Sequence, residues 1–312
     1  MSRAVTTRHR LEYFGFRALR GVFRLLPESW ALALGEGVGW IAGSIFRIRR
    51  RVVAANLALA FPERDARWRR AVARGSYRHL GREAVAMFRL GSRTREWVEA
   101  ATEVEGLEPL ASAVSAGRGG IVVTGHLGSW EMGGAAIAVR GMPVDAVALV
   151  QANPLFDRDL VATRERLGMS VVRRGDASRA VLRSLRAGRV PALVADQNAR
   201  NAPLFVPFFG VAAATFRGPA LFALRSGAPL FVGLCVRSSR RPQRYRVVIR
   251  EVSVPLTDDL EADVARLTEA WVAALEQGVR RDPEQYFWQH KRWKTRPPSE
   301  IETESTAIGY HP

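Results

Sequence analysis

The sequence predicts an α/β fold: a layered domain with a mostly parallel central sheet flanked by helices, plus an N-terminal helical segment that associates with a membrane. Three observations predict it. Short apolar runs alternate with helical stretches from about Gly117 onward, a pattern typical of parallel sheets. An arginine-rich amphipathic segment comes first, and 312 residues suffice for one such domain with an added segment. We expect the membrane-associating segment at residues 1–52, the main domain at 53–299 and a loose tail at 300–312.

Residues 10–26 predict a basic amphipathic helix. Arg10, Arg17, Arg20 and Arg24 recur at helical spacing on one face, while Phe and Leu side chains occupy the other. A helix of this composition is typical of a membrane interface, where each arginine near an anionic leaflet contributes about 1 kcal/mol.

The stretch 30–46 is apolar, but Glu36 and four glycines interrupt it. It is short for a membrane span, which needs about 20 apolar residues. The pattern fits a marginal transmembrane helix, an interfacial or re-entrant hairpin, or a helix docked on the main domain. We expect interfacial attachment.

An arginine-rich helix is expected over residues 63–90. Beyond residue 117, apolar runs predict strands at 121–124, 146–150, 171–172, 190–195, 230–236 and 245–249. The intervening stretches predict helices near 131–140, 155–167, 177–187 and 258–280. Residues 206–210, Val-Pro-Phe-Phe-Gly, are expected to form an exposed aromatic loop. The single cysteine, Cys235, excludes an internal disulfide and lies in an apolar run expected to be a buried strand.

The net charge is +17 and comes almost entirely from arginine, which a GC-rich genome also favours. A positive surface attracts polyanions: nucleic acid, an anionic membrane, phosphorylated lipid or an acidic carrier protein. No cluster of His, Cys and carboxylate residues indicates a metal, and metalloprotease, nucleophile-elbow and dinucleotide motifs are absent from the sequence. We therefore expect neither a metal nor a cofactor.

The sharpest local feature is Gly-His-Leu-Gly-Ser-Trp-Glu at residues 125–131, directly after the predicted strand 121–124. His126 is thereby placed at the carboxyl end of a strand, where open α/β sheets have their active sites. Ser129 is a candidate helix N-cap, which puts Glu131 in the first helical turn. A turn between them would let the Glu131 carboxylate reach His126, which then acts as a general base on an attacking hydroxyl. The alternatives are a structural histidine and a glutamate that only complements the helix dipole.

Two further stretches carry polar side chains of interest. Asp196 and Gln197 follow the predicted strand 190–195, again at a carboxyl end. Residues 283–296 interleave aromatic side chains with basic ones. Taken alone, the second stretch indicates either a nucleic-acid patch with stacking aromatics or a site for lipid headgroups and phosphate.

Several blocks, in this order, resemble the bacterial lipid A late acyltransferases of the lauroyl and myristoyl type. The first is Asn-Leu-Ala-Leu-Ala-Phe-Pro-Glu at 56–63, and the second is the His-x4-Glu spacing of His126 and Glu131. Asn-Pro-Leu-Phe-Asp at 153–157 and an arginine-containing stretch at 164–174 follow. Asp196, the 206–210 loop and Thr215 come next, and Pro-Glu-Gln-Tyr opens the last block at 283–292. The resemblance covers most of the chain.

The resemblance implies direct transfer of a fatty acyl chain, with no acyl-enzyme, from an acyl carrier protein or CoA thioester to a hydroxyl of a lipid A precursor or similar phosphorylated glycolipid. His126 and Glu131 are then the catalytic pair. Arg164 is the first candidate for stabilising an oxyanion or binding acceptor phosphate. The implied substrate-binding residues are Arg164, Arg174, Asn153, Asp196, Gln197, Thr215, Glu284, Gln285, His290 and Arg292. The expected location is the cytoplasmic (inner) membrane, with the catalytic domain on the cytoplasmic side.

Two alternatives stay open at this point. The phosphatidylinositol mannoside acyltransferases of actinobacteria, which use acyl-CoA, share the His-x4-carboxylate pair. A non-catalytic basic protein that binds a membrane or nucleic acid is the alternative of another class, and it predicts steeply salt-dependent nucleic-acid binding. We expect no nucleic-acid partner, because the arginines are dispersed along the chain and the sharpest motifs lie at predicted strand ends.

Overall fold

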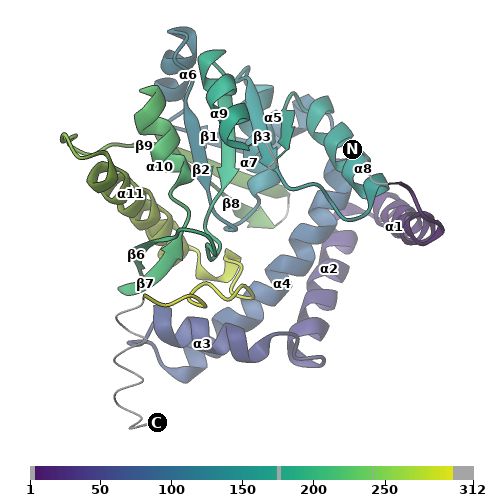
Figure 1. Ribbon diagram of the computed structural model, residues 1–312. Coiled ribbons are helices and arrows are strands. Elements are labelled where there is room, and N and C mark those ends of the chain that lie inside the picture. Colours follow the sequence, from purple (N-terminus) through teal and green to yellow (C-terminus); the bar gives the residue numbers. More distant parts are fainter. Residues whose placement is uncertain (1–3, 174–176, 241, 298–312) are drawn as a thin grey trace.

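A computed structural model describes residues 4–173, 177–240 and 242–297 (Figure 1). A seven-stranded sheet lies between two layers of helices, so the predicted α/β class is confirmed. The sheet has the order β1-β9-β8-β2-β5-β3-β4. Its strands are β1 (Thr102–Glu105), β2 (Ile121–Thr124), β3 (Val144–Ala148), β4 (Ser170–Arg173), β5 (Val190–Val194), β8 (Leu230–Arg240) and β9 (Gln243–Val252).

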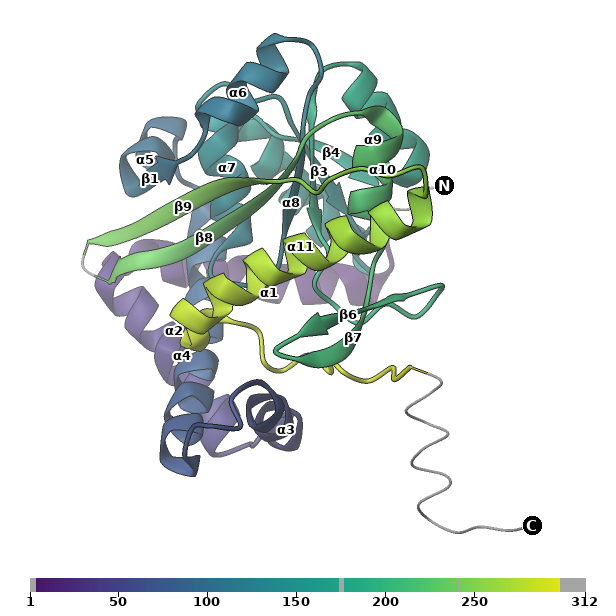
Figure 2. The same cartoon turned by 90° about the vertical axis from the view of Figure 1, so that its left-hand side faces the viewer.

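Neighbouring strands of the sheet are parallel except for the long β8–β9 hairpin, which is antiparallel. The predicted strands are therefore confirmed with shifted ends, while β1 was not predicted. Helices α5 (Arg95–Ala101), α6 (Glu108–Ser115) and α7 (Trp130–Val139) cover one face. Helices α9 (Ala177–Arg186), α10 (Gly218–Ser226) and α11 (Leu260–Arg281) cover the other, and Figure 2 shows α11 running across that face.

The remaining helices lie at one end of the sheet, below and beside it in Figure 1. They are α1 (Thr7–Leu25), α2 (Glu28–Ser44), α3 (Arg50–Ala60), α4 (Ala66–Leu90) and α8 (Pro154–Arg166). The predicted basic helix near the N-terminus and the long arginine-rich helix are thus present as α1 and α4, whereas α3, α5, α6 and α10 were not predicted.

Helix α2 packs on α4 through glycines. A Cβ at Gly35 would lie 2.6 Å from the Gly81 carbonyl oxygen, and one at Gly39 would lie 2.0 Å from the Tyr77 carbonyl oxygen. Larger residues would therefore push the two helices apart. The opposite side of α2 exposes a stripe of large apolar side chains at helical spacing, including Leu34, Val38 and Ile41. Among the described residues, no helix combines the length and apolar character needed to cross a bilayer.

The expectation of an exposed aromatic loop at residues 206–210 is wrong. These residues belong to a two-stranded antiparallel hairpin, β6 (Leu204–Phe208) and β7 (Val211–Thr215), visible beside α11 in Figure 2. Phe208 and Phe209 are buried because they pack on Trp293 and Trp288 of the C-terminal segment. The aromatic clusters at 206–210 and 286–293 are thus one packed unit, which neither stretch indicates alone.

Candidate active site

Sheet topology brings His126 and Asp196 together. Strands β2 and β5 are parallel neighbours, with Thr124 paired to Val194 at their carboxyl ends. His126 and Asp196 each lie two residues beyond that pair, so they meet at the same edge of the sheet. Gly125 permits this approach, because a Cβ there would lie 3.0 Å from the Asp196 Oδ2 atom and 2.8 Å from Leu275.

The carboxylate of Asp196 holds the histidine twice. The His126 backbone N–H donates to Asp196 Oδ2 at 2.8 Å, and His126 Nδ1 lies 2.7 Å from Asp196 Oδ1. Asp196 is only 3 % exposed. A buried carboxylate accepts hydrogen bonds when ionised, so Nδ1 carries the proton and Nε2 is left with its lone pair. The Gln197 side-chain nitrogen lies 3.4 Å from Nε2.

Electrostatics favours the charged pair. Burial opposes protonation of His126, but the charge and hydrogen bond of Asp196 outweigh it, and the pKa of His126 is raised above its ordinary value. Burial likewise opposes ionisation of Asp196, but His126 lowers the pKa of this carboxyl below its ordinary value. The imidazole is therefore poised to accept a proton and to be stabilised once it has done so.

The expected pairing of His126 with Glu131 is wrong. Glu131 lies in the first turn of α7 and forms a two-pronged ion pair with Arg164 of α8, with Arg164 Nε donating to Glu131 Oε2 at 3.0 Å and Nη2 to Oε1. Both side chains are about nine-tenths buried, each 11 % exposed. Because α7 starts only at Trp130, its first turn carries the Glu131 side chain toward α8, and the imidazole is left to the Asp196 carboxylate.

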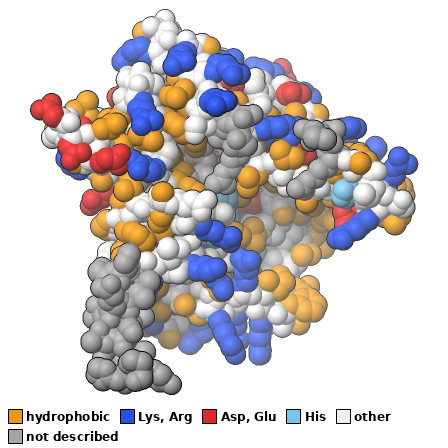
Figure 3. All heavy atoms as spheres, in the orientation of Figure 1, with side chains coloured by type: hydrophobic (Ala, Val, Ile, Leu, Met, Phe, Trp, Pro, Cys, Tyr) orange, Lys and Arg blue, Asp and Glu red, His pale blue; other side chains and the backbone are white. Residues whose placement is uncertain are grey.

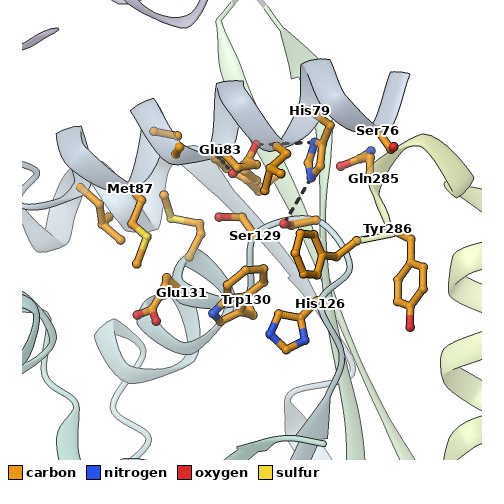
Figure 4. A pocket seen from close by; sticks show the side chains of 18 of the residues that line it. Ser76, His79, Glu83, Met87, His126, Ser129, Trp130, Glu131, Gln285 and Tyr286 are labelled. Carbon is orange, nitrogen blue, oxygen red and sulfur yellow. Dashed lines mark hydrogen bonds and ion pairs between the residues drawn. The ribbon is translucent and has the colours of Figure 1, made fainter. Parts of the chain in front are cut away.

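Two cavities meet at this site. One, of about 180 Å³, runs along α4 from Ser76 to Leu90, and the other, of about 670 Å³, lies against the sheet and α7. His126, Trp130, Glu131 and Met87 line both. Figure 4 shows the first cavity, with His126 and Trp130 on the side opposite α4, and Figure 3 shows this face of the molecule hollowed near its centre.

Three more of the predicted residues support the site from behind. Arg292 is buried and donates to the Ala214 carbonyl and the Thr215 hydroxyl, at 2.6 Å each. His290 Nε2 accepts from the Asn198 backbone at 3.0 Å, next to Gln197. These contacts tie the C-terminal segment to β7 and to the loop after β5, so these side chains brace the loop that carries Asp196.

Gln285 lies at the first cavity, whereas Asn153 and Glu284 line neither cavity. Asn153 caps α8 and donates through its amide to the His9 carbonyl and to Glu12 of α1, so its contacts join two helices. Glu284 is exposed and lines a separate arginine-bordered hollow beyond β8. Arg174 lies outside the described residues.

Several residues at the site were not predicted. The ring centroids of Trp130 and Phe287 lie 4.8 Å and 5.9 Å from that of His126. Burial and the charge of Asp196 raise the pKa of the Tyr286 hydroxyl well above its ordinary value. Trp130 could have been found, since it lies inside the 125–131 motif. Cys235 is buried in β8, as predicted, and burial raises the pKa of its thiol. The described residues contain no cluster of three or more side chains suited to hold a metal.

Comparison of the sequence with known proteins identifies its family. A family model described as bacterial lipid A biosynthesis acyltransferase matches residues 2–295. The lipid A biosynthesis palmitoleoyltransferase of Escherichia coli is 30% identical over 299 residues, which cover 94% of each chain. The lipid A biosynthesis lauroyltransferase of the same organism is 30% identical, with 93% of each chain covered. A phosphatidylinositol mannoside acyltransferase of Mycobacterium tuberculosis is 27% identical over 195 residues, or 61% of this chain and 59% of the relative. The resemblance of the sequence blocks is thereby confirmed, and the chain belongs to the bacterial lipid A biosynthesis acyltransferase family and is an acyltransferase.

Proposed function

We propose that this acyltransferase moves a fatty acyl chain directly from a thioester to a hydroxyl of a lipid A precursor, with His126 as the general base. The observation that carries the proposal is the buried Asp196 carboxylate on His126 Nδ1, at a point where two cavities meet. A reaction between two lipid substrates requires two binding spaces that share one reactive group.

The steps follow from the protonation states. His126 Nε2 takes the proton of the acceptor hydroxyl while the hydroxyl oxygen attacks the thioester carbonyl carbon. Asp196 stabilises the imidazolium that forms. The tetrahedral intermediate then collapses, the carbon–sulfur bond breaks, and the imidazolium returns the proton to the departing sulfur. The products are an ester and a free thiol, and no acyl-enzyme forms.

Arg164 is the proposed cation for the negative charge that develops. It lines the larger cavity with Glu131 and His126. The two-pronged contact with Glu131 fixes the plane of the guanidinium group, and a preorganised cation stabilises an oxyanion more than a mobile one does. Glu131 is therefore proposed as the residue that positions Arg164, and a phosphate of the acceptor is the other anion that this site suits.

The proposed donor is the thioester of an acyl carrier protein. Carrier proteins are acidic, and a protein with a net charge of +17 attracts them electrostatically. Acyl-CoA carries the same thioester and is the alternative donor.

We propose that residues 1–52 attach the enzyme to the interface of the inner membrane on its cytoplasmic side. Most of the exposed large apolar side chains lie within residues 11–48, on α1, α2 and the turn after α2. Phe14, Leu25 and Phe46 are each more than two-thirds exposed. Arginines follow at once at Arg49 and Arg50, where an anionic leaflet would attract them.

The test is an acyl-transfer assay with the purified protein in detergent. Acyl carrier protein and CoA thioesters are offered separately, against a lipid A precursor and against a phosphatidylinositol mannoside. We expect transfer to the lipid A precursor that His126→Ala abolishes. Transfer to the mannoside alone would show that the acceptor is a phosphatidylinositol mannoside, as the name of the mycobacterial relative indicates for that protein. Equal transfer by His126→Ala and by the wild type would refute the role of His126 as the general base.

A further inference from the structure

A buried charged cluster lies behind the loop that carries His126. Helix α4 contributes His79 and Glu83, and β8 contributes Arg237. The three side chains are between 7 % and 11 % exposed. Arg237 Nη1 lies 3.1 Å from His79 Nδ1 and 3.3 Å from Glu83 Oε1, and the Tyr245 hydroxyl lies 3.5 Å from Glu83 Oε2.

The cluster holds the loop at two consecutive residues. His79 Nε2 lies 3.4 Å from the Gly128 carbonyl oxygen, and the Ser129 hydroxyl lies near Glu83, where it opposes the rise in pKa that burial imposes on that carboxyl. Figure 4 shows His79 reaching down from α4 to this loop, with Ser129 directed toward Glu83. Because Arg237 donates to Nδ1, the proton of His79 is on Nε2, which donates to Gly128. Burial and the neighbouring Arg237 keep His79 neutral by lowering its pKa to about 3.

The loop has little freedom elsewhere. Gly128 has a positive φ of 62°, and a Cβ there would lie 1.9 Å from the Cys235 carbonyl oxygen. Its N–H donates to Gln285 at 2.9 Å, and the Ser129 N–H donates to Cys235 at 2.8 Å. Ser129 is the N-cap of α7, yet its side chain caps no backbone N–H of that helix. Its hydroxyl lies toward Glu83 instead.

Stability alone is a weak reason for such a cluster. Burying an ion pair carries a large desolvation cost, and an apolar replacement of similar volume is often as stable. What the ion pair adds is a single geometry, and here that geometry fixes the backbone two and three residues after His126.

We propose that Glu83, with His79 and Arg237, is a positioning residue for acyl transfer: the cluster sets the path of Gly128 and Ser129 and thereby the orientation of His126 and the start of α7. The inference rests on the proposed role of His126 as the base. None of the three residues needs to take part in the proton transfer itself.

Helix α4 offers a matched control one residue away. Arg82 donates to Glu36 Oε1 of α2 at 2.9 Å, and this pair is also largely buried. Glu36 lines neither cavity and touches no part of the 125–131 loop in any of its described contacts. Replacing Glu36 therefore removes a comparable ion pair from the same helix without touching the site.

The experiment compares Glu83→Leu, Glu83→Gln, Glu36→Leu and Glu36→Gln in the full chain, measuring Tm, kcat and KM. We expect the Leu variants to lower Tm by similar amounts. Glu83→Leu should lower kcat about 100-fold with KM for the donor within threefold, since small misplacement of reacting groups has effects of this size. Glu83→Gln keeps an acceptor for Ser129 and should recover most of that loss, while both Glu36 variants stay within threefold of wild-type kcat.

Equal kcat for Glu83→Leu and Glu36→Leu would overturn the proposal, and so would a loss confined to KM. If Glu83→Leu does not fold, Ser129→Ala removes the contact from the loop side. It should lower kcat about 10-fold with Tm unchanged, and an unchanged kcat would refute the inference. The protein has five histidines, and the NMR signals of the His126 ring report its orientation without any need for turnover. A wild-type protein without acyl transfer would contradict the proposed function, whereas His126 signals that do not move in Glu83→Leu would contradict the positioning role.

Discussion

The two carboxylates at the site differ in what places them. Asp196 and His126 are 70 residues apart in the chain but lie at equivalent points past two hydrogen-bonded strands, 2.7 Å from one another. Glu131 is only five residues from His126, yet its partner is Arg164, 33 residues further on. A short separation in sequence does not bring two side chains together when a helix begins between them, whereas neighbouring parallel strands bring together whatever follows each of them.

The two pairs also have different proposed roles in the reaction. The Asp196–His126 pair can move a proton, because Asp196 holds one proton on His126 Nδ1 and leaves the Nε2 lone pair to accept another. The Glu131–Arg164 pair holds a guanidinium cation in a fixed plane beside the site, so it suits the stabilisation of an anion. Variants of the two pairs should therefore differ in pH dependence as well as in the size of their effect.

The largest effect should come from His126→Ala, which removes the proposed base. We expect kcat to fall about 10⁴-fold, at the upper end of what general-base catalysis contributes. Far-ultraviolet circular dichroism and Tm of the variant should match the wild type, since the imidazole is at the edge of the sheet. Turnover within tenfold of wild type would remove His126 from the mechanism.

Asp196→Asn should lower kcat about 10²- to 10³-fold, because an amide no longer holds the tautomer with Nε2 unprotonated. Its pH dependence has a defined sign. The base must be neutral, and Asp196 raises the pKa of His126 in the wild type despite burial, so activity should rise with pH along a limb in which His126 loses its proton, at a pH above the ordinary pKa of histidine. Without the carboxylate the pKa of His126 falls, and the limb moves to lower pH. If the pH dependence of kcat/KM is the same in Asp196→Asn and the wild type, a group other than His126 controls it.

Glu131→Gln should have a smaller effect, about 10- to 100-fold in kcat/KM, since it loosens Arg164 without removing it. The pH limb should stay where the wild type has it, in contrast to Asp196→Asn. A shift of the limb in Glu131→Gln would indicate that Glu131 reaches His126 during the reaction. Arg217→Gln breaks an ion pair with Glu261, and neither of these two side chains lines a cavity. This variant is the control and should leave kcat/KM unchanged.

Much of the fold follows from sequence because the alternation of apolar runs with helical stretches is local. Residues 121–124 and 190–195 could both be recognised as strands, and the polar residues after them as lying at carboxyl ends. What the sequence did not supply was strand order. Sequence alone does not show that β2 and β5 are neighbours, so it does not match Asp196 with His126, and the His-x4-Glu spacing points to Glu131 instead.

The buried cluster shows a second limit of sequence analysis. His79 and Glu83 lie one helical turn apart on α4, a spacing typical of an exposed ion pair on a surface helix. Both are buried in the fold, and their shared partner Arg237 lies more than 150 residues later. Long-range packing also explains why residues 206–210 form a buried hairpin: the aromatic side chains that cover them lie between Tyr286 and Trp293.

The smallest expected effect concerns the apolar face of α2, which does not touch either pair. Val38 is 60 % exposed, on the side of α2 that faces away from α4. Val38→Glu places a charge where we propose that the bilayer interface lies, so binding to vesicles with anionic lipid should weaken about 10-fold in sedimentation assays. In detergent with soluble donor and acceptor, kcat should match that of the wild type, because both cavities are unchanged. Val38→Leu is the matched control and should bind vesicles as the wild type does. Unchanged binding by Val38→Glu would place the membrane contact on another face, and would leave the comparison between the Asp196 and Glu131 pairs intact, since that comparison depends on the strand ends alone.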